Sequence, residues 1–106
     1  MACLALVTGD DINLPVQLLC DGEPFTISAS ATVRASIISR TGQVVGPVTL
    51  HQWPGSDWAN SLVIVRFPRA LSLTMAIGAA ELQVKVDDGI EETWVFEPIY
   101  VKRGYN

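Results

Sequence analysis

Apolar and polar residues alternate with a period of two along most of this chain. The clearest run covers residues 80–87, where every second side chain is apolar and those between are polar or charged. A helix would spread such residues around its surface, whereas a strand places them on one face. Similar alternation near residues 12–20 and 31–39 predicts further strands with one buried face. The residues expected in the core are Leu14, Val16, Leu18, Val33, Ala35, Ile37, Leu82, Val84, Val86, Trp94 and Phe96.

Turn signals rich in glycine, proline and aspartate separate the alternating runs. Asp88-Gly89 stands between two of them, and glycine readily adopts the positive φ that a tight hairpin needs. Pro15, Pro47 and Pro98 lie inside runs, so those strands are expected at a sheet edge or with a bulge, because proline donates no ladder hydrogen bond. The strands are predicted near residues 3–8, 12–20, 31–39, 43–50, 60–67, 79–87 and 91–102.

The fold class follows from the number and spacing of these strands. About seven short antiparallel strands predict one immunoglobulin-like β-sandwich domain over residues 1–106. A partly open small β-barrel is the alternative. Residues 68–78 mix strand-like alternation with a possible helical turn, and we expect them to form a connection that plugs one end of the core.

Composition and charge narrow the classes of partner. Hydrophobic residues make up 49% of the chain and charged residues 17%, which favours a folded domain with apolar surface left for a partner. The net charge is −4 and the basic residues are scattered, so nucleic-acid binding is not expected. No apolar run has the length of a membrane span, and residues 1–7 lack the basic start of a signal peptide. We therefore expect no membrane partner, and synthesis in a cytoplasm.

The two cysteines, Cys3 and Cys20, lie in neighbouring predicted strands. One interpretation is a disulfide between these strands, and the other is two small buried hydrophobic side chains. Because no export signal is visible, free thiols are the favoured prediction. No Cys-x-x-Cys or Cys/His spacing indicates a zinc site, so neither a metal nor a cofactor is predicted.

Candidate catalytic residues are few. His51 precedes Ser56 and Asp57, but no nucleophile-elbow motif surrounds the serine, and we interpret the histidine as a polar loop residue. The acidic residues at 87–92 are interpreted as a solvated hairpin tip, because the pattern of a calcium loop is absent. The sequence therefore predicts no enzyme.

Aromatic residues are the best candidates for binding. Trp53 and Trp58 flank a Pro-Gly turn, where they either stack on a sugar or anchor an interface, or fold back to cap the core. Tyr100 and Tyr105 lie in a tail that has no closing helix and is able to dock on a neighbour. These four residues are the candidate interface.

A further pattern covers most of the chain. It comprises the acidic turn and alternating strand at residues 9–20, the corner Asp21-Gly22-Glu23-Pro24, the strand Val33-Arg34-Ala35-Ser36-Ile37, and residues 73–101 with their Asp88-Gly89 hairpin. This pattern resembles the amino-terminal domain of tailed-phage baseplate upper proteins and the related immunoglobulin-like attachment domains of tail-fibre proteins. The aromatic residue that usually follows the glycine is absent, since Ala79 and Ala80 stand there.

The resemblance implies a structural virion protein without catalytic residues. Such a domain attaches a fibre, spike or receptor-binding module, so the expected partners are other phage structural proteins and identical copies in the assembled particle. The expected location is the virion, with assembly in the host cytoplasm. The chain is then either a free-standing adaptor or one domain of a longer protein. The alternative function is a carbohydrate-binding module that uses Trp53 and Trp58, and a small hydrolase or inhibitor is a weaker third.

Overall fold

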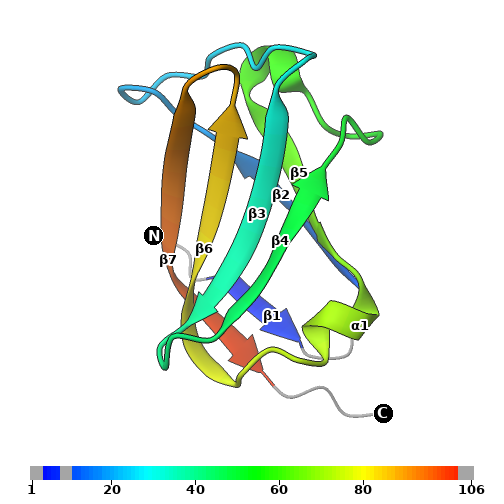
Figure 1. Ribbon diagram of the computed structural model, residues 1–106, viewed down its shortest axis with the longest axis vertical. Helices are drawn as coiled ribbons and strands as arrows, with labels where there is room; N and C mark the ends of the chain where they lie inside the picture. Colours follow the sequence, from blue (N-terminus) through cyan, green and yellow to red (C-terminus); the bar gives the residue numbers. More distant parts are fainter. Residues whose placement is uncertain (1–3, 8–10, 103–106) are drawn as a thin grey trace.

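The alternating segments of the sequence fold as strands. The structure, a computed structural model, describes residues 4–7 and 11–102, and within them seven strands form two sheets (Figure 1). A single-turn 3-10 helix, η1 (Trp58–Asn60), precedes β5, and a short helix, α1 (Arg69–Ser72), follows it. The strands are β1 (Leu4–Val7), β2 (Ile12–Gln17), β3 (Thr32–Ser39), β4 (Val44–Leu50), β5 (Leu62–Phe67), β6 (Gly78–Asp87) and β7 (Glu91–Lys102).

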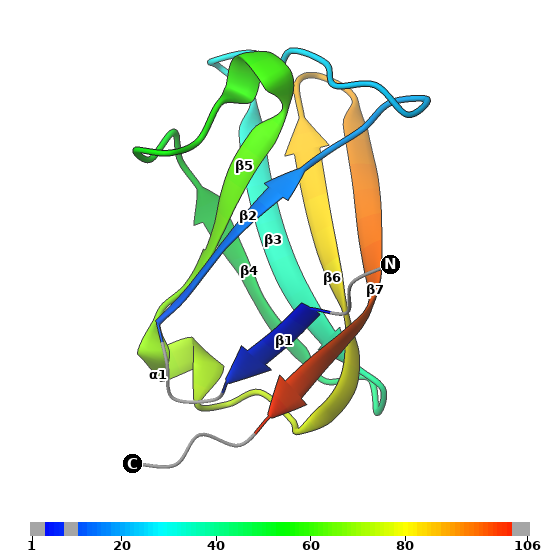
Figure 2. The ribbon, with the colours of Figure 1, turned by 180° about the vertical axis from the view of Figure 1, so that it is seen from behind.

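The two sheets stack as a sandwich. The large sheet has the order β1-β7-β6-β3-β4, and the small sheet pairs β2 with β5. Figure 2 shows the small sheet crossing in front of the large one. An immunoglobulin-like sandwich has the same order, with strands G, F, C and C′ on one sheet and B and E on the other. Every pairing is antiparallel except that of β1, which runs parallel to β7. The predicted β-sandwich is confirmed, and the sheets do not close into the alternative barrel.

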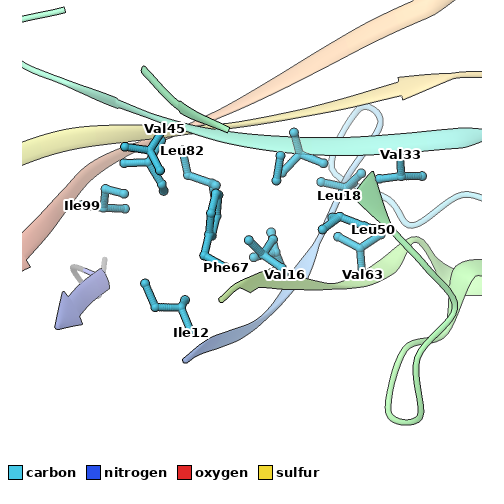
Figure 3. Packing of buried hydrophobic residues seen from close by; sticks show 14 of the residues in the cluster. Ile12, Val16, Leu18, Val33, Val45, Leu50, Val63, Phe67, Leu82 and Ile99 are labelled. Atoms are coloured by element: carbon cyan, nitrogen blue, oxygen red, sulfur yellow. The ribbon is translucent and has the colours of Figure 1, made fainter. Parts of the chain in front are cut away.

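The core lies between the sheets and consists of the residues that alternation assigned to it. Leu18, Val33, Leu82 and Val84 are fully buried, and Figure 3 shows Phe67 reaching from the small sheet toward Leu82. The predicted burial is thus confirmed for most of the set. Three of the set are half-buried and pack against the core. They are Leu14 on β2 and Trp94 and Phe96 on β7, whose inner face the narrow small sheet does not cover completely.

All three prolines within strands lie at a sheet edge or at a bulge, where a residue that donates no backbone hydrogen bond is tolerated. Pro15 is on β2, which pairs only with β5 in the described part of the chain. Pro47 lies in a bulge of β4, where two residues stand opposite Ser36, and Pro98 lies at a similar irregularity of β7. Gly46 completes the β4 bulge with φ of 110°, and a Cβ there would lie 2.9 Å from the carbonyl oxygen of Ala35. The predicted edges and bulges are confirmed.

The connection between β5 and β6 closes the lower end of the sandwich in Figure 1. Its first part forms α1, and Met75 then inserts into the core with only 5% of its surface exposed. Gln43 holds this segment by donating to the Thr74 carbonyl and accepting from the Ala76 amide. The predicted plug is therefore confirmed.

Candidate functional site

The two tryptophans of the 53–58 loop lie in different environments. Trp58 begins η1 and is 7% exposed, with its ring in the core. Its carbonyl accepts hydrogen bonds from the amides of Ile27 and Ser61, which fixes the turn that directs the ring inward. Trp53 remains half-buried at the surface. The prediction of an interface containing both rings is therefore wrong for Trp58, and so is the two-tryptophan platform for sugars.

Trp53 is packed against polar neighbours. The guanidinium carbon of Arg66 lies 4.7 Å from the centre of the indole ring, and the His51 ring meets the indole edge-on at 5.3 Å. Arg66 is on β5, directly opposite Asn13 on β2. Its Nε donates a hydrogen bond of 2.7 Å to the Asn13 side-chain oxygen. The arginine is thus held on one side by an amide and on the other by an aromatic face.

These residues line a pocket of about 460 Å³, which we call the Trp53 pocket. This volume falls in the range of about 300–1,000 Å³ that small-ligand sites occupy. Asp11 supplies the one carboxylate of the lining, and one of its oxygens accepts a hydrogen bond from the backbone amide of Arg69. The complete lining is Asp11, Ile12, Asn13, Val48, Thr49, His51, Trp53, Arg66, Phe67 and Pro68.

The loop beyond Trp53 shows what its polar residues do. The Ser56 hydroxyl donates to the Trp53 carbonyl at 2.6 Å, and the Asp57 carboxylate accepts from the Asn60 side chain at 2.7 Å. His51 contacts the Trp53 ring instead of either residue. The three residues are therefore engaged separately and do not form a catalytic triad.

Tyr100 lies on the outer face of the large sheet, away from Trp53. It stands opposite Ala79 on β6, beside a shallow hollow of about 720 Å³ that Arg40 and Glu81 also line. Val44 and Val95, 56% and 49% exposed, lie on the same face. We call the apolar group on this face the outer-face patch; it consists of the exposed Val44, Val95 and Tyr100 and the half-buried Ile38. Tyr105 lies outside the described residues.

Cys20 is exposed, so the prediction that it is buried is wrong. The strand pairing of β2 ends at Gln17, and Cys20 instead pairs with Glu23 across a tight turn. Alternation therefore no longer sets which way its side chain faces. The cysteine is a free thiol beside a pocket of about 260 Å³, where Phe25 stacks on Trp94 at 5.3 Å. Cys3 lies outside the described residues.

The acidic residues near the β6–β7 turn are exposed to solvent, as predicted. One of them, Glu91, forms an ion pair of 3.4 Å with Lys85. Across residues 4–7 and 11–102, no group of three or more His, Cys, Asp or Glu side chains is placed to hold a metal ion. None of the helices in this part of the chain is both long and apolar enough to cross a membrane.

Sequence reasoning identified Trp53 and missed its partners. The only signal for Arg66 was its outward position in an alternating strand, which many surface residues share. The comparisons with known proteins add no further candidates, since no protein-family model and no curated protein matches the sequence.

Proposed function

We propose that this chain is a non-catalytic structural protein of a tailed-phage particle. It serves as an adaptor or attachment module of the tail, baseplate or capsid vertex and binds other virion proteins. The source of the virion assignment is the resemblance of residues 9–37 and 73–101 to the attachment domains of baseplate and tail-fibre proteins. The strand order, which matches that of an immunoglobulin-like sandwich, is compatible with this resemblance.

The observation that carries the protein-binding role is the outer-face patch. Val44 and Val95 are each about half exposed and stand on the solvent side of the large sheet, where alternation usually places polar residues. Exposed apolar groups that share one face are typical of interaction surfaces. Polar residues such as Ser36 and Gln83 lie between them, so a protein that covers this face meets apolar and polar side chains together.

A second supporting feature is the edge of the large sheet. In the described part of the chain β4 pairs only with β3, so one side of β4 presents unpaired backbone groups. The Pro47 bulge interrupts this edge, which disfavours unlimited strand pairing between copies. The edge is thus suited to a defined neighbour in a ring of identical copies, as the proposal requires.

The experiment that tests the proposal is quantitative mass spectrometry of purified phage particles. We expect a fixed copy number for each particle, in keeping with repeated identical copies, and absence of the chain from purified particles would refute the virion role. A Val95→Glu variant should be incorporated poorly, because it places a charge in the covered patch. The matched control is Thr93→Glu on the same face of β7, which should be incorporated normally.

A carbohydrate-binding role has less support. It required Trp53 and Trp58 together, and Trp58 is buried in the core. One face of Trp53 is covered by the Arg66 guanidinium. A flat, open aromatic platform for a sugar ring is therefore not formed by these residues.

A further inference from the structure

The geometry of Arg66 points to a second binding site, and we propose that the Trp53 pocket binds a side-chain carboxylate of a partner protein. The inference deepens the proposed function, on which it rests, by naming the chemistry of one partner. It is carried by three features of the pocket: a fixed guanidinium, its free nitrogen atoms, and the charge around it.

The guanidinium of Arg66 is held in one orientation. Its Nε donates to Asn13, and its carbon atom lies over the Trp53 ring. A free arginine side chain loses considerable rotational freedom when it binds a ligand, and prior fixation removes part of that cost. The contacts of Arg66 therefore prepare it for binding.

The two terminal nitrogens of Arg66 are open as far as residues 4–7 and 11–102 are concerned. Among the described residues neither Nη atom has a hydrogen-bond partner, and no carboxylate lies within ion-pair distance of them. Since Nε is occupied, the open side of the guanidinium is the Nη pair, whose parallel N–H groups match the two oxygens of a carboxylate. The free geometry is thus that of an end-on bidentate pair.

The charges that line the pocket favour a singly charged anion over a doubly charged one. Asp11 lines the pocket together with Arg66, and its carboxylate repels an incoming anion. The single positive charge of Arg66 can neutralise the one negative charge of a carboxylate. It cannot neutralise the two charges of a phosphate dianion, which Asp11 would also repel. The partly apolar lining, which includes Ile12, Val48 and Pro68, suits the methylene groups of a glutamate side chain.

A solvent-exposed arginine–carboxylate pair is weak by itself, so we expect this pocket to act together with a wider protein contact. The probe for the isolated site is N-acetyl-glutamate N-methylamide, which has neutral ends and a single carboxylate. Its neutral control is N-acetyl-glutamine N-methylamide. Binding is followed by NMR through the Nε–H signals of Arg66 and Trp53.

We expect the glutamate compound to shift both signals saturably and the glutamine compound to leave them unchanged. Arg66→Gln should abolish the effect, and Arg34→Gln, which removes an exposed arginine on the large sheet, should preserve it. Asp11→Asn keeps the oxygen that accepts from Arg69 and should tighten binding about threefold, as expected for removing one like charge several ångströms away in water.

Equal shifts with the glutamine compound would overturn the proposal, and this comparison uses the unmodified protein, so it does not depend on the folding of a variant. Tighter binding of inorganic phosphate would identify a phosphate site, and tighter binding of glucuronate would identify a site for acidic sugars; either result overturns a protein carboxylate as the ligand. Particle composition tests the virion role separately, so the two proposals fail by different measurements.

Discussion

Ser61 is a buried polar residue whose replacement gives an unusual order of stabilities. It is fully buried, and its φ of 55° and ψ of 26° place it in the left-handed region. Its hydroxyl donates to the Leu18 carbonyl and accepts from the Phe25 amide at 3.4 Å. Its backbone carbonyl accepts from the Leu18 amide at 3.0 Å. One serine therefore joins the chain after β2, the segment at Phe25 and the turn that follows Trp58.

The magnitude follows from these contacts. Ser61→Ala removes the hydroxyl and leaves the Leu18 carbonyl buried without its donor, which costs about 1–3 kcal/mol. Alanine keeps the unfavourable left-handed backbone. Ser61→Gly loses the same hydrogen bonds, but glycine adopts this backbone without strain, so it should be more stable than the alanine variant by about 1 kcal/mol. In most folded segments the order is the reverse, because glycine loses more chain entropy on folding.

The assay is equilibrium unfolding in urea, with the slope required to stay the same among variants. Ser36→Ala serves as the control, because no hydrogen bond of the Ser36 side chain appears in the described part of the chain. Its free energy of unfolding should stay within about 0.5 kcal/mol of that of the original protein. If Ser61→Ala were as stable as the original, or more stable than Ser61→Gly, the reasoning from the buried hydroxyl and the left-handed backbone would be refuted.

Trp58→Ala should lower the free energy of unfolding by about 3 kcal/mol. Trp53→Ala should lower it by about 1 kcal/mol, because it removes mainly a cation–π contact at the surface. Equal losses in urea unfolding would contradict the separate environments of the two rings. Val84→Asp should unfold the protein at room temperature by burying an unpaired charge, and a native circular dichroism spectrum would contradict this. In a Cys3→Ser variant, Cys20 should react with Ellman's reagent without denaturant, and reaction only after unfolding would disprove its exposure.

The alternation of the sequence was sufficient to predict the large sheet. Along residues 33–37 of β3 and 80–86 of β6 each apolar residue faces the core and each residue between faces the solvent side, so burial follows directly from position. The prediction failed where pairing stops. Cys20 continues the apolar alternation of β2 in the sequence, but the pairing of β2 ends at Gln17 and Cys20 already pairs with Glu23 across the turn. The corner Asp21-Gly22-Glu23-Pro24 marks this turn only from the residue after Cys20.

The candidate site was less predictable, because it depends on contacts between distant segments. The environment of Trp53 is created by β5 and by the start of β2, whose pairing places Arg66 opposite Asn13. The environment of Trp58 depends on the hydrogen bonds that close η1, including one from the amide of Ile27. In the sequence both tryptophans flank the same Pro-Gly turn. Tertiary contacts alone therefore decide that Trp58 is buried and that Trp53 stays at the surface.

The two surfaces have a consequence for the proposed adaptor role. An adaptor must contact at least two neighbours at the same time, so its binding surfaces have to be separate. The outer-face patch lies on the solvent side of the large sheet, whereas the Trp53 pocket is lined mainly by the small sheet and the loop after β4. They also differ in chemistry, since one presents exposed apolar side chains and the other an arginine held in place. A particle in which the outer-face patch contacts identical copies and the Trp53 pocket receives an acidic residue of another protein would use two surfaces that share no residue. A copy that pairs along the β4 edge, in contrast, would approach Val48 and Thr49, which line the pocket.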